Sequence, residues 1–221
     1  MINLHEIASS LKNCKSGETS SMVAMAVEEN CSIECIIREG LYPGIMAAEK
    51  QYRDKEILIP DILAAERALN QSIKILRSSM QNEDNSQYGK VVTGTVKGDI
   101  REWEKNLISV LIQSMGITVI DLGTSVPIES FINAAMDEEA RIIACSTALT
   151  THLPQMKHLV TALNAANLKE RIKTLFSGGP VTQLLCRGIG ADFYAPDAIS
   201  IAEIAVDYCR KELNFSEMQA V

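Results

Sequence analysis

The chain has 221 residues, of which 47% are hydrophobic and 22% charged, and its formal net charge is −7. This length favours one large domain or two small ones, and it supports a hydrophobic core without disulfides or bound metals. Acidic residues outnumber Lys and Arg by 28 to 21 without a dense basic cluster, which argues against nucleic acid as a partner. No apolar run approaches the roughly 18 residues that span a bilayer. We therefore expect a soluble, cytoplasmic protein with no membrane partner.

The cysteines are scattered through the chain without a CxxC pair. Cys31 and Cys35 are one helical turn apart, but no nearby His or Cys completes a set of metal ligands. Because the sequence shows no secretory signal, reduced and buried thiols are favoured over disulfides. The six cysteines are at positions 14, 31, 35, 145, 186 and 209.

Residues 1–80 have helical periodicity, which predicts a small bundle of four or five short helices. We expect the third helix to end at Gly40, because glycine is favoured after the last helical residue. Pro43 and Pro60 should lie in the first turns of the next two helices. The polar segment 81–89 has no apolar period and is the predicted linker. The expected helices begin near residues 4, 18, 32, 43 and 60, and the last ends near residue 79.

From residue 90 to 221 the pattern changes to short β-branched or apolar segments that alternate with segments of helix length. This alternation predicts an α/β fold, with a five-stranded, parallel, doubly wound Rossmann-like sheet covered by helices on both faces. Ligands of such sheets bind beyond the carboxyl ends of the strands. The loops after the strands are therefore the candidate site. The expected strands are 90–96, 118–121, 141–146, 173–176 and 193–195.

The strand-end loops contain neither a GxGxxG fingerprint nor a P-loop, so NAD and ATP are not expected as cofactors. Ser146, Asp99 and His152 are residue types of a hydrolytic triad, but the GxSxG turn that such a triad needs is missing. No side chain is a convincing general base or nucleophile. A catalytic residue is therefore not assigned.

Ordered motifs run through nearly the whole chain, at 40–44, 59–65, 94–106, 121–129, 146–151, 178–182 and 189–198. Together they resemble the corrinoid proteins of methyltransferase systems, which carry methyl groups on cobalamin, and the cobalamin-binding module of methionine synthase. The resemblance implies three parts: a helical cap over residues 1–80, a linker over 81–89 and a cobalamin-binding domain over 90–221. It also implies that the cap moves aside for each partner, with the linker as the hinge.

The resemblance further implies that the dimethylbenzimidazole tail of cobalamin leaves the cobalt and threads into the α/β domain. Gly178 and Gly179 would let backbone approach the tail, and the Ser146 hydroxyl would bond a tail nitrogen or hold its loop. Ordinary structural roles are the alternative for these three residues, and Tyr194 could equally belong to the core. The cofactor-binding residues implied are Thr95, Gly98, Asp99, Ile100, Arg101, Ser146, Ala148, Leu149, Thr150, Gly178, Gly179, Pro180, Tyr194 and Asp197.

One motif departs from the family. In the family pattern Asp-x-His-x-x-Gly the histidine is the lower ligand of the cobalt, and here Asp99 is followed by Arg101 and Glu104 at the histidine and glycine positions. Arginine keeps its proton and offers no lone pair, so it cannot ligate cobalt. The usual relay from carboxylate through imidazole to metal is therefore missing. The family's Ser-x-Leu likewise becomes Ser146-Thr147-Ala148.

Three interpretations of this departure stay open. In the first, the chain binds cobalamin without a protein ligand below and shuttles methyl groups from a substrate-specific corrinoid methyltransferase to a methyl-acceptor methyltransferase, with a corrinoid reductive activase as a further candidate partner. In the second, favoured by the bulk of Trp103 and Glu104, it has lost cobalamin and is a partner-binding or regulatory relative. In the third, His152 is a substitute ligand. The first makes the chain a methyl-carrier subunit of an enzyme system.

Overall fold

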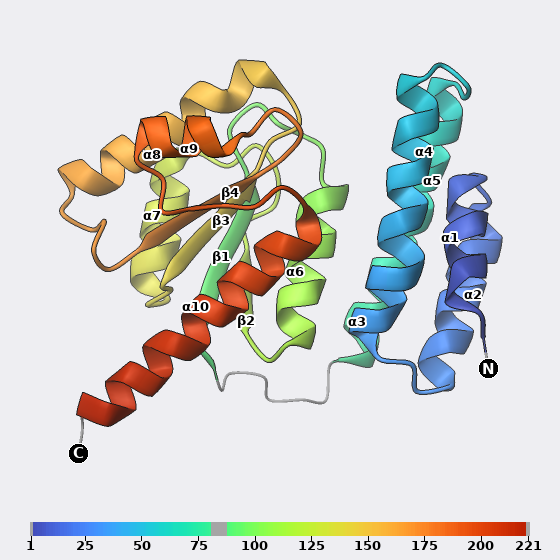
Figure 1. Cartoon of the computed structure of the whole chain (residues 1–221), viewed down its shortest axis with the longest axis horizontal. Coiled ribbons are helices and arrows are strands. Elements are labelled where there is room, and N and C mark those ends of the chain that lie inside the picture. The colour runs from blue at the N-terminus through green and yellow to red at the C-terminus, as the bar shows by residue number, and fades with distance from the viewer. Residues whose placement is uncertain (1, 81–87, 220–221) are drawn as a thin grey trace. The chain divides into compact units, whose positions relative to one another are not determined.

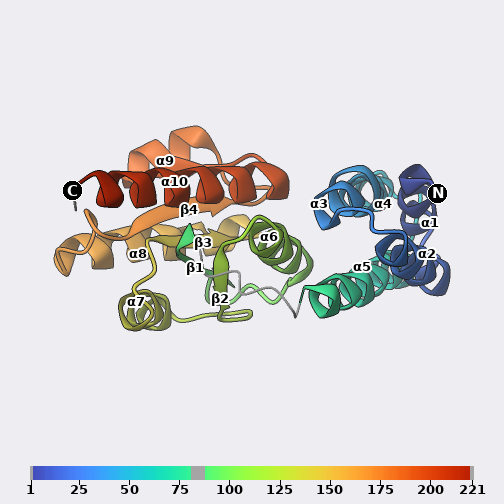
Figure 2. The same ribbon diagram turned by 90° about the horizontal axis from the view of Figure 1, so that it is seen from below.

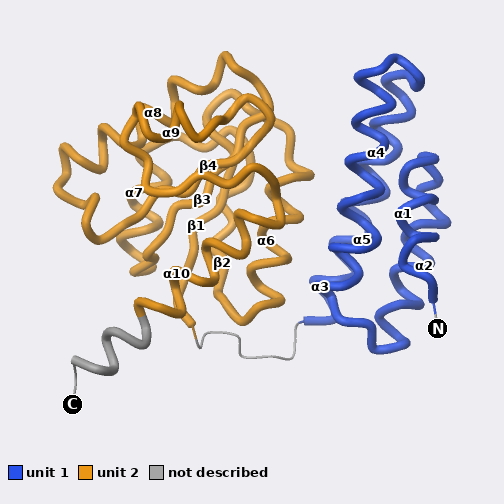
Figure 3. Tube along the Cα trace, in the orientation of Figure 1, with its two compact units in different colours: residues 1–83 blue, residues 84–221 orange. Residues whose placement is uncertain are grey.

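The computed structural model describes residues 2–80 and 88–219, with side chains up to residue 212. The chain divides into two compact units, residues 1–83 and 84–221 (Figures 1 and 3). Most of the predicted linker, residues 81–87, lies outside the described residues. Within the described ranges, no helix has both the length and the apolar character that crossing a membrane requires.

The first unit is a helical bundle, as the periodicity predicts. Helix α1 packs against α4, and α2 packs against α5. Pro43 and Pro60 occupy the first turns of α4 and α5, where the absent N–H has no helical partner to lose. The helices are α1 (Leu4–Lys12), α2 (Ser16–Glu28), α3 (Ile33–Cys35), the π-helical segment η1 (Ile36–Leu41), α4 (Tyr42–Arg53) and α5 (Ile59–Ser79).

The prediction that a helix ends at Gly40 is wrong. The chain continues from α3 through η1 directly into α4, and Gly40 lies buried within η1. A Cβ atom at Gly40 would lie 3.2 Å from the Ile7 Cβ and 3.3 Å from the Leu4 carbonyl oxygen. Glycine is therefore used here to let α1 approach the π-helical turn, and not to end a helix.

The second unit is a five-stranded parallel sheet with the order β2-β1-β3-β4-β5, which confirms the predicted Rossmann-like fold (Figure 1). Its strands are β1 (Lys90–Thr95), β2 (Thr118–Asp121), β3 (Ile142–Ser146), β4 (Lys173–Ser177) and β5 (Phe193–Tyr194). Its helices are α6 (Trp103–Ser114), α7 (Ile128–Asp137), α8 (Leu153–Ala165), α9 (Gln183–Ile189) and α10 (Ala198–Gln219). A 3₁₀ turn, η3 (Thr150–His152), precedes α8.

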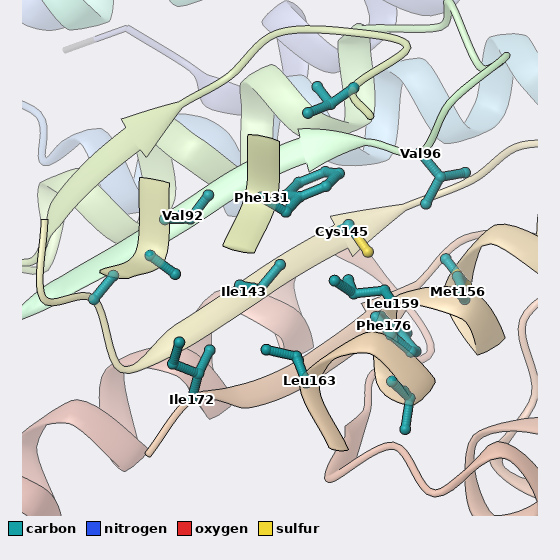
Figure 4. Packing of buried hydrophobic residues seen from close by; sticks show 14 of the residues in the cluster. Val92, Val96, Phe131, Ile143, Cys145, Met156, Leu159, Leu163, Ile172 and Phe176 are labelled. Carbon is teal, nitrogen blue, oxygen red and sulfur yellow. The ribbon is translucent and has the colours of Figure 1, made fainter. Parts of the chain in front are cut away.

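Helices cover both faces of this sheet (Figure 2). On one face, Val92, Ile143 and Phe176 of the strands pack with Phe131 of α7 and Leu159 of α8 in a continuous core (Figure 4). On the other face α6 and α10 pack against each other and against the central strands. The strand order reverses between β1 and β3, so the carboxyl ends of these two strands mark the topological switch point.

Candidate functional site

Three hydroxyl-bearing residues lie side by side at the carboxyl edge of the sheet. Thr95 ends β1 and pairs with Ser146, which ends β3, and Ser146 in turn pairs with Ser177 at the end of β4. All three are buried. The loops that follow these three strands therefore begin next to one another. They bring predicted residues from separate parts of the sequence to the same edge of the sheet.

The Asp99 carboxylate joins the loop after β1 to the loop after β3. Its Oδ2 accepts a hydrogen bond of 2.6 Å from the Ala148 backbone N–H, and its Oδ1 accepts one of 3.0 Å from the Arg101 N–H. Only 3% of Asp99 is exposed to solvent. Hydrogen bonds to a buried carboxylate are among the stronger ones in proteins, so this contact fixes the distance between the two loops.

Ser125, in the loop after β2, is tied to the loop after β1. The Ser125 Oγ accepts a hydrogen bond of 3.0 Å from the Gly98 N–H, and the Ser125 N–H donates to the Thr95 Oγ1 and the Asp99 carbonyl, both at 2.9 Å. The Thr95 hydroxyl also donates to the Asp99 carbonyl at 2.6 Å. Three strand-end loops are thus connected through backbone groups and short side chains.

An ion pair between α6 and the end of β2 supports this arrangement. Lys105 on α6 is 4% exposed, and its Nζ lies 2.6 and 2.7 Å from the two carboxylate oxygens of Asp121 at the end of β2. The same Nζ donates to the Asn106 Oδ1 at 2.6 Å. With three acceptors around one ammonium group, the buried charge is well compensated, and α6 is anchored to the edge of the sheet.

The two adjacent glycines after β4 have different surroundings. Gly178 has a φ of +119°, and a Cβ there would lie 2.0 Å from the Thr147 carbonyl oxygen, so the fold itself requires glycine at this position. A Cβ at Gly179 would meet no atom within 4 Å. Of the two, Gly179 is the one whose backbone a bound group can approach.

Arg101 stands at the family's ligand position, and His152 is the candidate substitute ligand of the cobalt. Arg101 is exposed, and its N–H closes a turn on the Asp99 carboxylate. His152, in η3, is half-buried, with its Nδ1 3.5 Å from the Thr147 hydroxyl. A Cβ built at Gly98 would lie 3.0 Å from the His152 Nε2, so this imidazole faces the backbone of the loop after β1. The structure thus brings His152 next to the predicted site.

Glu104, in the first turn of α6, also belongs to this edge. The Ser177 hydroxyl donates to its Oε1 at 3.3 Å. Burial raises the pKa of the Glu104 carboxyl from 4.5 to about 7; the Ser177 hydrogen bond and the Arg101 charge oppose this shift, while the Asp99 and Asp197 charges add to it. Near neutral pH this carboxyl therefore exists in both protonation states.

Two cysteines lie in the core beneath the strand ends. Cys145 of β3 packs in the cluster that also contains Met156 and Phe176 (Figure 4), and Cys186 of α9 belongs to the same cluster. Burial raises the pKa of the Cys145 thiol, and the neighbouring Cys186 adds to that rise. Burial likewise raises the pKa of Cys186 to about 11. Both are therefore thiols, not thiolates, at neutral pH.

The predicted site residues all come to the carboxyl edge of the second unit. Tyr194 pairs with Phe176 across β4 and β5, and the Asp197 Oδ1 accepts the N–H groups of Ile199 and Ser200 at the start of α10. Thr95 and Ser146 are the last residues of β1 and β3, and Thr150 begins η3. The other predicted residues lie in the loops after β1, β3 and β4.

Ser125 and Ser177 are not among the predicted site residues, and Glu104 is singled out only as a departure from the family pattern. The sequence offers a reason to include both Ser177 and Glu104, because Ser177 comes directly before Gly178 and Glu104 stands at the family's glycine position. The contact between them was hidden, because it joins residues 73 positions apart. Ser125 carries no sequence signal beyond its place after a strand.

Comparisons with known proteins identify the family of this chain. Residues 89–202 match the model of a B12 binding domain, and residues 4–77 match a second B12 binding domain model. The chain is 32% identical to dimethylamine corrinoid protein 3 of Methanosarcina acetivorans, over 88% of this chain and 91% of that one. The chain belongs to the family of B12-binding corrinoid proteins.

Further relatives cover both units of this corrinoid family member. A corrinoid protein of Desulfitobacterium hafniense is 33% identical over 81% of this chain and 85% of its own. The monomethylamine corrinoid protein of Methanosarcina barkeri has the same fold, with a TM-score of 0.81, 24% identity and coverage of 93% of this chain and 97% of that one.

We expect Gly178→Ala to destabilise the second unit by about 2–4 kcal/mol, because the new methyl group meets the Thr147 carbonyl at a positive φ. Urea unfolding followed by the fluorescence of Trp103, the single tryptophan, measures this loss. Gly179→Ala is the matched control and should change stability by less than about 0.5 kcal/mol. Equal losses of unfolding free energy in the two variants would contradict the conclusion that only Gly178 is required by the fold.

We expect the second unit to lose stability as the pH rises from 5 to 8. The folded state binds the Glu104 proton more tightly than the unfolded state, so ionisation between pH 4.5 and about 7 disfavours folding. The loss should be about 1–3 kcal/mol, and Glu104→Gln should remove it. Urea unfolding at several pH values, read from Trp103 fluorescence, is the measurement. Glu129→Gln, a change of an exposed acid on α7, should keep the wild-type slope.

Proposed function

We propose that this chain binds cobalamin at the carboxyl edge of its parallel sheet and carries methyl groups between two methyltransferases. The observation that carries this proposal is the fixed set of strand-end loops, joined through the Asp99 carboxylate, in a chain of the corrinoid protein family. When bound, the cobalt supplies the centre that takes up and releases the methyl group. The protein supplies the surface, the orientation and the charge.

Exposed apolar side chains at this edge support the proposal that it binds a corrin ring. Ile100 is 78% exposed and Leu149 is 54% exposed, and they come from the two loops that Asp99 joins. Large apolar side chains that water surrounds on adjacent loops indicate a surface that a ligand covers. Open backbone at Gly179 adds a place where the cofactor can approach closely. In this proposal Asp99 positions the loops, while Ile100 and Leu149 contact the macrocycle.

The lower face of the ring would meet Arg101 instead of an imidazole. A guanidinium group cannot ligate cobalt, but it places a positive charge at the loop and can pair with a cofactor phosphate. A bound corrinoid would then take up methyl groups without a ligand from residue 101. We therefore propose a corrinoid without a protein ligand on its lower face.

The helical unit would act as the cap of the cofactor. We propose that residues 1–80 shield the upper face at rest, that 81–89 form the hinge, and that 90–221 bind the corrinoid. The separate family-model matches over 4–77 and 89–202 support a division into two parts. The partners would be a substrate-specific corrinoid methyltransferase and a methyl-acceptor methyltransferase, with a corrinoid reductive activase as a third. A cytoplasmic location is part of this proposal.

A second candidate function rests on Glu104. Its carboxyl group is bonded to Ser177 at the strand ends, where the family places a glycine and the tail of the cofactor. A chain whose tail site is filled in this way would be a partner-binding or regulatory relative that has lost cobalamin. The cofactor-binding experiment below separates the two functions.

We expect purified protein to retain hydroxocobalamin through desalting and to show a spectrum without coordinated dimethylbenzimidazole. The reason is that the dimethylbenzimidazole tail would leave the cobalt, and that Arg101 provides no imidazole to take its place. The visible absorption spectrum of the desalted protein is the measurement. A colourless protein would overturn the carrier function and favour the regulatory one. A spectrum with the base coordinated would contradict a displaced tail.

We expect Arg101→His to move the bound spectrum towards that of a histidine-ligated corrinoid, because it restores an imidazole on the turn that Asp99 holds. Visible and electron paramagnetic resonance spectra of the bound cofactor report the axial ligand. His152→Ala is the control and should leave the wild-type spectrum unchanged. If His152→Ala removes a nitrogen ligand, His152 is the substitute ligand, and an unaltered Arg101→His spectrum would mean that residue 101 does not lie beneath the cobalt.

A further inference from the structure

Glu104 reaches the part of the site where the tail of the corrinoid is expected. It starts from the first turn of α6, and its Oε1 accepts the hydrogen bond of Ser177 at the end of β4. Its position matters because Ser146, the neighbour of Ser177 in register, is the residue expected to meet the tail. Glu104 thus adds a carboxyl group to a surface where the family pattern has no side chain.

Both negative and positive charges act on Glu104. The charges of Asp99, on the loop after β1, and Asp197, at the start of α10, both act on the Glu104 carboxyl, and the cation that acts on it is Arg101. Near pH 8 most of the Glu104 carboxyl is ionised, because its pKa is about 7. A carboxylate only accepts hydrogen bonds, so a group buried against it is stabilised when it brings N–H or O–H donors.

The lower bases of corrinoids differ in this property. Dimethylbenzimidazole, once released from the cobalt, presents a nitrogen lone pair and two methyl groups, and it has no N–H donor. Adenine, the base of pseudocobalamin, carries an exocyclic amino group with two N–H donors. A dimethylbenzimidazole lone pair that faces the ionised Glu104 carboxylate gains no hydrogen bond from it, whereas an amino group forms charge-assisted hydrogen bonds with it.

We propose that Glu104 determines which lower base this chain accepts, and that it selects corrinoids whose base carries an N–H donor, the adenine class, over dimethylbenzimidazole. This inference rests on the proposed binding of a corrinoid with a displaced tail. The family pattern needs an open site for the tail, whereas this chain places a carboxyl group there. In this inference Glu104 changes which base the site accepts and does not block the site.

The test is a competition for the full-length chain at pH 8. Limiting protein is mixed with equal amounts of hydroxocobalamin and its adenine counterpart, hydroxo-pseudocobalamin, then desalted, and the bound corrinoids are released and quantified by chromatography with mass detection. We expect the wild-type chain to retain the adenine form with at least about a tenfold excess, the ratio that one well-placed hydrogen bond to a charged group supplies. Cobinamide, which has no base, is measured separately.

Three variants assign the preference to Glu104. Glu104→Gly restores the family residue and should reduce the excess to twofold or less, and Glu104→Gln, which can donate to the dimethylbenzimidazole nitrogen, should do the same with a side chain of equal size. Glu102→Gln removes an exposed carboxylate at the start of the same helix and should keep the wild-type preference. The fluorescence of Trp103 verifies that each variant is folded.

The outcomes separate this inference from the proposed function. If neither full corrinoid nor cobinamide is retained, corrinoid binding itself fails. If the corrinoids are retained but the wild-type chain shows no preference, or prefers dimethylbenzimidazole, the carrier function stands and the inference about Glu104 is overturned. A preference that persists in both Glu104→Gly and Glu104→Gln also overturns it, since the selectivity would then come from other residues.

Discussion

The buried Asp99 carboxylate is the constraint on which the carboxyl edge of the sheet depends. One of its oxygens is bonded to Ala148 and the other to Arg101, so a single side chain fixes two loops that lie 49 positions apart in sequence. Where an imidazole follows such an aspartate, the carboxylate can orient a metal ligand; here its two oxygens accept backbone N–H groups of Ala148 and Arg101. This explains how the edge can keep its form without the histidine of the family motif.

The sequence was sufficient to predict the strands of the second unit, because each is a short β-branched or apolar run between helix-length segments. It also predicted which loops converge, since the carboxyl ends of parallel strands meet at one edge. The prediction failed at Gly40. Glycine is common at helix ends, but here it is needed because α1 approaches the backbone at this position too closely for a side chain. The contact of Glu104 with Ser177 could not be predicted, because it depends on how α6 lies against the end of β4.

The two glycines after β4 show why a motif match does not by itself assign a role. Both belong to the same family segment, yet the Thr147 carbonyl leaves no space for a side chain at Gly178, whereas Gly179 faces open space. Gly178 would be required with or without a cofactor. The position that carries information about a ligand is therefore Gly179, together with the exposed apolar side chains of Ile100 and Leu149.

The buried thiols near the strand ends could compete as methyl acceptors if they were ionised. A thiolate is a good methyl acceptor, and Cys145 lies one residue before the strand-end Ser146. Because burial raises the pKa values of Cys145 and Cys186, both sulfurs keep their protons in the core. The second unit thus keeps two sulfur atoms in its core in the protonated form, which is a far weaker nucleophile than a thiolate.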